Sequence, residues 1–183
     1  MKKHALVIGG TGMLKGVVTW LHEQGYVVSV VGRQKHKYER MMKETELDSR
    51  VHFIEVDYFI LEDFKQKIIE AVDTMGPISL CITWMRSDAV TGFDWLKSYL
   101  MEEKADVELY EIKGSHASRI PFSPVTSEAF VWKRIILGFK IEGKESRWLM
   151  NKEISNGVIE SIENKHDLHI VGVVEPWGNR PSY

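Results

Sequence analysis

The chain of 183 residues has little of what secreted, membrane-spanning or nucleic-acid-binding proteins need. Its one cysteine, Cys81, cannot form a disulfide within the chain and stands in an apolar run, which predicts a buried thiol in a reducing cytoplasm. A net charge of −2 argues against a general nucleic-acid or membrane-surface binder. No apolar run is long enough for a membrane span, and the run after Lys3 ends at Gly9, too soon for a signal peptide.

Metal sites and multiple domains are also not expected. The seven histidines show no spacing typical of a metal site, and a lone cysteine excludes a cysteine cluster, so we predict no bound metal. A content of 44% hydrophobic and 27% charged residues is ordinary for a globular domain. No linker, repeat or low-complexity tract divides the chain, so residues 1–183 are expected to form a single cytoplasmic domain.

The feature that the sequence does have is a glycine-rich turn between two apolar strands. Residues 5–8 form an apolar run that ends at Gly9-Gly10-Thr11-Gly12, and residues 27–31 form a second run. Between them, a stripe with helical spacing predicts an amphipathic helix that ends at Gly25; its members are Leu14, Val17, Val18 and Leu21. Such a turn presents backbone N–H groups and the positive end of a helix to a pyrophosphate, which predicts a dinucleotide site. Lys15 replaces the third glycine of a G-x-x-G-x-x-G pattern, so another phosphate ligand, such as a nucleotide sugar, stays an alternative.

The residues after the second strand favour NADP over NAD. In dinucleotide-binding folds an acidic residue about 20 positions after the glycines binds the ribose 2′-hydroxyl, whereas an arginine there suits a 2′-phosphate. Here Arg33 stands at that place, and the first carboxylate after it is Glu39. The alternative role of Arg33 is that of an ordinary cation at a strand end. The same choice between phosphate attraction and a solvated helix face applies to the cluster of Lys35, Lys37, Arg40 and Lys43.

Strands and helices continue to alternate along the rest of the chain. Further strands are predicted at 51–56, 78–84, 107–112, 131–141 and 169–174. Helices are predicted at 34–50, 61–75, about 93–104 and from Asn151, which is predicted to cap its helix. This order predicts an α/β, Rossmann-like, doubly wound and mostly parallel seven-stranded sheet with helices on both faces. Its topological switch is expected between the first and fourth strands.

Doubly wound sheets bind ligands outside the carboxyl ends of their strands, beside the switch. The residues expected to bind the cofactor there belong to the glycine turn and to the ends of the second, third and fourth strands: Gly9, Thr11, Gly12, Met13, Leu14, Arg33, Asp57, Tyr58, Thr83, Trp84 and Met85. Residues 114–128, rich in serine and proline, are predicted to form a loop at the same edge.

These features resemble the short-chain dehydrogenase/reductase superfamily. The resemblance lies in the VIGGTGML turn, the VVGR strand end, the VD pair after the third strand and the closing unit EISNGVIESIENKHDLHIVGVV. It implies an NADP-dependent oxidoreductase that acts on the carbonyl group of a small molecule and forms a homo-oligomer. In that family a tyrosine transfers the proton, a lysine four residues later lowers its pKa, and the nicotinamide supplies the hydride.

The catalytic residues of the family are largely missing. No tyrosine of this chain has a lysine four residues later, Trp132 stands near the expected tyrosine position, and Thr83-Trp84-Met85-Arg86 replaces the family's Asn-Asn-Ala-Gly turn. Residues 113–130 contain prolines and are too few for a loop followed by a long helix, so the helix that carries the pair is expected to be absent.

Two functions follow from this pattern. In the first, the chain is an atypical NADP-dependent oxidoreductase in which Ser115 is a counterpart of the family serine and His116 donates the proton. Ser118 is the other counterpart of that serine, and the alternative for His116 is an ordinary surface histidine. In the second, the chain is a non-catalytic NADP-binding protein that senses the cofactor or docks a partner.

Overall fold

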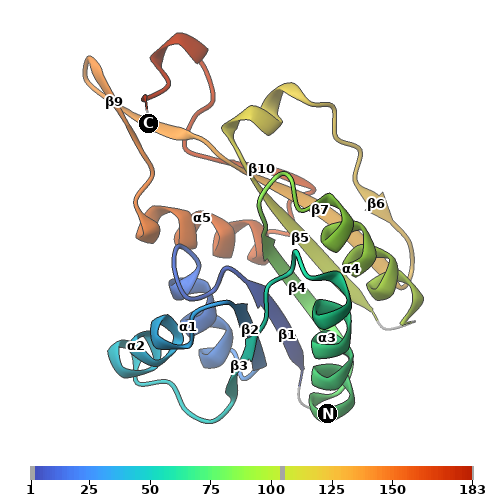
Figure 1. Ribbon diagram of the computed structural model, residues 1–183. Coiled ribbons are helices and arrows are strands. Elements are labelled where there is room, and N and C mark those ends of the chain that lie inside the picture. Colours follow the sequence, from blue (N-terminus) through green and yellow to red (C-terminus); the bar gives the residue numbers. More distant parts are fainter. Residues whose placement is uncertain (1–2, 104–105, 183) are drawn as a thin grey trace.

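The computed structural model describes residues 3–103 and 106–182, and a mostly parallel sheet forms its centre (Figure 1). Within these residues the parallel strands follow the order β3-β2-β1-β4-β5-β7-β10, and β6 (Val125–Thr126) pairs antiparallel with β7. The bounds are β1 (His4–Ile8), β2 (Val27–Gly32), β3 (Val51–Glu55), β4 (Ile78–Trp84), β5 (Val107–Gly114), β7 (Phe130–Leu137) and β10 (Leu168–Val171). Since β1 lies between β2 and β4, the predicted doubly wound fold and its switch point are confirmed.

Helices cover both faces of the sheet (Figure 1). One face carries α1 (Lys15–Glu23), α2 (Lys35–Thr45) and α5 (Asn151–Glu163), and the other carries α3 (Leu61–Met75) and α4 (Val90–Glu102). Successive residues of a strand point to opposite faces. Accordingly Ala5 and Val7 of β1 pack toward α1, while Leu6 and Ile8 pack toward α3. This double burial explains why the first strand is apolar at nearly every position.

The C-terminal third differs from the prediction in three places. The single strand predicted at 131–141 is two strands, because the chain leaves the sheet after Leu137 and β8 (Phe139–Glu142) pairs with β9 (Glu145–Trp148) in a separate antiparallel hairpin. The strand predicted at 169–174 ends at Val171, since Gly172 has a φ of 76°. Asn151 is the first residue of α5 and not its cap; Met150 precedes the helix, and its N–H donates to Glu153 at 2.9 Å.

Residues 115–129 contain no α-helix, although they connect two neighbouring parallel strands. The described chain there forms the short 3₁₀ helix η1 (Ser115–Arg119), a loop and β6. The ring of Phe122 from this loop packs edge-on against Trp132 of β7, with ring centroids 5.1 Å apart. The sheet face beside α4 is therefore covered by a thin loop where a crossover helix would otherwise stand.

Two further observations concern Cys81 and the helices. Cys81 is fully buried in β4, as predicted, and burial raises the pKa of its thiol. Within the part of the chain that the structure describes, no helix combines the length and apolar character needed to span a bilayer.

His4 gives the stability of the fold a testable dependence on pH. It is fully buried, and its ring nitrogens lie 2.8 Å from the carbonyl oxygen of Gly76 and 2.8 Å from the hydroxyl of Ser29. Burial is the main cause that lowers the pKa of His4 from its ordinary value of 6.5, so the unfolded chain binds a proton that the folded chain does not. We expect His4 to stabilise the fold fully above about pH 6.5 and to lose this contribution below it, by up to about 1.4 kcal/mol per pH unit, until the folded pKa is reached.

Urea unfolding of the wild type and of His4→Gln over this range measures the effect. The difference in unfolding free energy between the two proteins should shrink as the pH falls, and pH curves that run parallel would contradict the assignment.

Candidate functional site

A cavity of about 390 Å³ lies at the carboxyl ends of β1, β2 and β4. We call it the glycine-turn cavity. It is lined by Gly9, Thr11, Gly12, Met13, Val31, Gly32, Arg33, Gln34, Lys37, Val56, Tyr58 and Trp84. Its position beside the switch point is where doubly wound sheets bind ligands.

Each glycine of the turn has a separate steric role. Gly9 has a φ of 90°, and a Cβ added there would lie 3.1 Å from Cβ of Trp84. A Cβ at Gly10 would lie 2.9 Å from Val18, so this glycine lets α1 pack against the sheet. A Cβ at Gly12 would meet no atom within 4 Å, so the backbone here is open to an incoming group. The turn therefore combines a tight bend, close helix packing and an exposed backbone, as phosphate-binding turns require.

Helix α5 supports the turn from the far end of the chain. A Cβ at Gly16 would lie 2.8 Å from Cβ of Ser155, so α1 and α5 approach each other closely. The Ser155 hydroxyl donates to the carbonyl oxygen of Met13 at 2.9 Å. This bond fixes the backbone just before α1, where the first amides of a helix have no intrahelical acceptor and carry partial positive charge.

The charged side chains that line the glycine-turn cavity are both cations. Arg33 follows β2 and Lys37 stands in the first turn of α2, and no carboxylate belongs to the lining. The Arg33 side chain is 63% exposed, and its Nη1 lies 3.6 Å from Asp57 Oδ2. An adjoining cavity of about 280 Å³ adds Lys15 and Arg40, with Glu44 held by Lys15 at 2.7 Å. The site is thus electropositive at the end of β2.

Most of the residues predicted to bind the cofactor come together around this cavity. Those that line it are Gly9, Thr11, Gly12, Met13, Arg33, Tyr58 and Trp84. Leu14, Thr83 and Met85 are buried in the core and line neither this cavity nor its neighbour. Asp57 lies at the rim beside Arg33 and accepts the Phe59 N–H at 3.0 Å. Cofactor contact stays a prediction for all eleven residues.

The lining also includes residues that were not predicted as cofactor ligands. The sequence presents Lys37 only as one member of a basic cluster, and its place in the first turn of the helix after β2 is the signal that could have pointed to it. Gln34 and Val56 carry no such signal, because an amide at a helix start and a valine at a strand end are ordinary.

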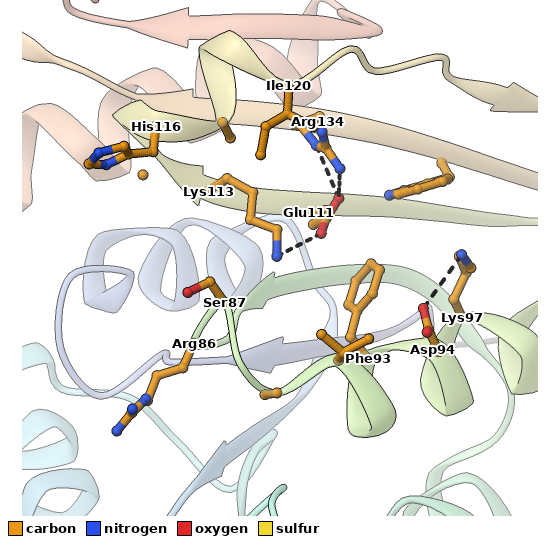
Figure 2. A pocket seen from close by; sticks show the side chains of 15 residues that line it. Arg86, Ser87, Phe93, Asp94, Lys97, Glu111, Lys113, His116, Ile120 and Arg134 are labelled. Carbon is orange, nitrogen blue, oxygen red and sulfur yellow. Dashed lines mark hydrogen bonds and ion pairs between the residues drawn. The ribbon is translucent and has the colours of Figure 1, made fainter.

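A second cavity, of about 440 Å³, lies further along the same edge of the sheet (Figure 2). We call it the charged groove. It is bounded by the loop after β4, by α4, by β5 and β7, and by η1; its lining is Arg86, Ser87, Ala89, Val90, Phe93, Asp94, Lys97, Glu111, Lys113, Gly114, His116, Ala117, Ile120, Trp132 and Arg134. It occupies the sheet face beside α4 that no crossover helix covers.

The predicted catalytic residues lie at the end of this groove. His116 lines it, whereas Ser115 is buried at the start of η1 and does not. Arg180 Nη1 lies 3.1 Å from His116 Nε2, and the Trp177 ring stands edge-on to the imidazole at 5.1 Å. Because arginine can only donate, Nε2 accepts this bond and the proton of a neutral ring stands on Nδ1. Among the described residues no group of three or more histidine, cysteine, aspartate or glutamate side chains is placed to hold a metal.

No protein-family model and no curated protein matches the chain, but solved structures do. A short-chain dehydrogenase from Bacillus anthracis aligns with a TM-score of 0.57 at 17% identity, over 65% of this chain and 58% of that one. A short-chain dehydrogenase/reductase from Brucella melitensis, titled a glucose/ribitol dehydrogenase, aligns with a TM-score of 0.69 at 13% identity, over 94% and 97%. One from Burkholderia phymatum in complex with NAD aligns with a TM-score of 0.69 at 9% identity, over 96% and 90%. The chain therefore has the short-chain dehydrogenase/reductase fold, as its resemblance predicted.

Two glycines with positive φ provide a matched test of the turn. Gly9 has a φ of 90° and touches Trp84, whereas Gly25, with a φ of 83°, has nothing within 4 Å of an added Cβ. Gly25→Ala should cost only the backbone strain, about 1 kcal/mol of unfolding free energy. Gly9→Ala should cost more, by about a further 1 kcal/mol, because Trp84 must also move. Urea unfolding measures both, and equal losses would contradict the packing of Trp84 on the turn.

Proposed function

We propose that this chain binds NADP(H) in the glycine-turn cavity and is an atypical oxidoreductase acting on the carbonyl group of a small molecule. The observation that supports this best is one cavity that joins an open glycine turn at the switch point to Arg33 and Lys37, with no carboxylate in its lining. When bound, the cofactor supplies a hydride. The proposal extends to a single nucleotide-binding domain that forms a homo-oligomer and works in the cytoplasm.

The residues around the cavity fit such a cofactor. The open backbone at Gly12 and the start of α1, supported by Ser155, suit a pyrophosphate. Arg33 and Lys37 suit a 2′-phosphate, since a planar guanidinium can make two hydrogen bonds to phosphate oxygens and a lysine adds a point charge. Tyr58 offers a ring beside the same pocket.

His116 is the proposed proton donor. It lines the charged groove, which lies further along the same edge of the sheet as the glycine-turn cavity. Nε2 accepts the bond from Arg180, so the Nδ1–H remains available as a donor. An alkoxide that develops at the end of the groove would take this proton, and the negative charge left on the imidazole would lie against the Arg180 guanidinium, 3.1 Å from Nε2. Ser115, whose hydroxyl is buried under the same turn, is proposed to support that site.

Cofactor choice is tested by titrating the protein with NADPH and NADH and following tryptophan fluorescence, because Trp84 lines the cavity. NADPH should bind more tightly. Arg33→Ser should weaken NADPH binding about tenfold and change NADH binding little, since only NADPH carries the 2′-phosphate. Lys43→Ser, which removes a cation of α2 that lines neither cavity, is the control. Equal affinity for both cofactors would contradict the role of Arg33.

Turnover is tested by NADPH absorbance against a panel of aldehydes and ketones. With a substrate found, His116→Ala should lower kcat about a hundredfold and leave the Kd of NADPH unchanged, since the histidine acts on the substrate oxygen. His36→Ala, an exposed histidine that lines neither cavity, should keep full activity. Tight NADPH binding without turnover across the panel would instead support the non-catalytic NADP-binding protein.

A further inference from the structure

We propose that the charged groove is a binding site for a small amphipathic monocarboxylate, a ligand with one carboxylate and an apolar or aromatic body. The groove binds this ligand by itself, so the proposal does not depend on NADP(H). The features that carry it are an excess of cations over carboxylates in a half-enclosed space and an apolar wall beside them.

The charges of the groove do not balance. Glu111 is 3% exposed, and its two oxygens are shared between two cations: Lys113 Nζ lies 3.0 Å from Oε1, and Arg134 Nη2 lies 2.8 Å from Oε2. Figure 2 shows both cations converging on this one carboxylate. One buried carboxylate between two cations leaves a net positive charge where water is partly excluded, and a further anion would be stabilised there.

A third cation faces the same space. Lys97 on α4 lies over the ring of Trp132, with Nζ 4.5 Å from the centroid. Its carboxylate neighbour Asp94 is at 3.8 Å and is 60% exposed, so this pair is loose and solvent-screened. These weak contacts allow Lys97 to turn toward an anion in the groove.

Arg86 is engaged elsewhere, although it lines the groove. Its guanidinium binds Asp88 at 2.7 Å and lies over the Phe59 ring at 5.5 Å. Figure 2 shows it pointing away from the cluster around Glu111. The excess charge that a ligand meets thus comes from Lys97, Lys113 and Arg134 against Glu111 and Asp94, and equals one positive charge. One carboxylate neutralises it.

The rest of the lining selects an apolar body. It consists of Ala89, Val90, Phe93, Ala117, Ile120 and Trp132. Lys113 lies 5.6 Å from the Phe93 centroid, so cation and aromatic wall are adjacent. A cavity of about 440 Å³ is of the size that holds small organic ligands. A carboxylate between Lys97 and Lys113 would place its apolar body along α4 and Ile120.

The test uses four probes with one body and different charges, titrated into the chain without cofactor and followed by calorimetry: 3-phenylpropionate, 3-phenylpropan-1-ol, 3-phenylpropylamine and 2-phenylethyl phosphate. The indole N–H resonance of Trp132, which has no hydrogen-bond partner among the described residues, reports binding in the groove by NMR. The propionate should bind at least about tenfold more tightly than the alcohol, and the amine should not bind. An alcohol that binds as well as the acid, or no binding by any probe, would overturn the proposal; so would tighter binding of the phosphate, which would assign the groove to phosphorylated ligands.

Two variants in the groove have opposite expected signs, and a third, outside it, controls for a general charge effect. Lys113→Met should weaken propionate binding about tenfold, because it removes one of the lysines that bind the carboxylate of the ligand. Arg134 still pairs with Glu111 in this variant. Asp94→Asn should strengthen it about threefold, because Lys97 loses its competing partner. Lys67→Met on α3, which removes a lysine paired with Glu70 outside the groove, is the control and should change nothing. Melting curves identify any variant that fails to fold, and changes of the same sign in Lys113→Met and Asp94→Asn would overturn the assignment.

Discussion

The close approach of α1 and α5 is the contact on which the candidate cofactor site depends. It requires a residue without a side chain at Gly16, and it brings the Ser155 hydroxyl to the carbonyl of Met13. The glycine turn is therefore held on one side by Trp84 at Gly9 and on the other by a helix from the last quarter of the chain. A flexible turn fixed at both ends presents its open backbone at Gly12 in one arrangement, which lowers the entropy lost when a phosphate binds.

The absence of a crossover helix between β5 and β7 explains why the charged groove exists. In a doubly wound sheet a helix between β5 and β7 would bury their side chains on the α4 side, and apolar residues would be expected there. Instead the strands carry Glu111, Lys113 and Arg134 on that face, with Trp132 and Phe122 as a partial cover. Charged residues at these positions are consistent with a surface that stays hydrated or meets a polar ligand, since burying them under an apolar helix would be costly.

The sequence predicted the parts of the fold that local patterns determine. Apolar runs predicted the strands that are buried on both faces, and helical spacing predicted α1. The glycine turn and the absence of a helix between β5 and β7 were also evident from the sequence. The hairpin of β8 and β9 could not. Residues 130–142 are rich in β-branched and aromatic residues and resemble one strand, and the bend at Gly138 arises from its packing against the backbone of Val173. The charged groove could not be predicted either, because its residues come together only when the loop after β4, α4, β5, η1 and β7 are assembled.

The arrangement around Glu111 also restricts how this protein can vary. Replacing the carboxylate alone would leave Lys113 and Arg134 facing each other with no counter-charge, and replacing Arg134 alone would leave a buried acid held by a single lysine. The first step leaves two cations without a counter-charge in a half-enclosed space, and the second removes the guanidinium that donates two hydrogen bonds to the buried acid. The three positions are thus energetically coupled, so the effects of replacing them singly on stability would not add up to the effect of replacing them together.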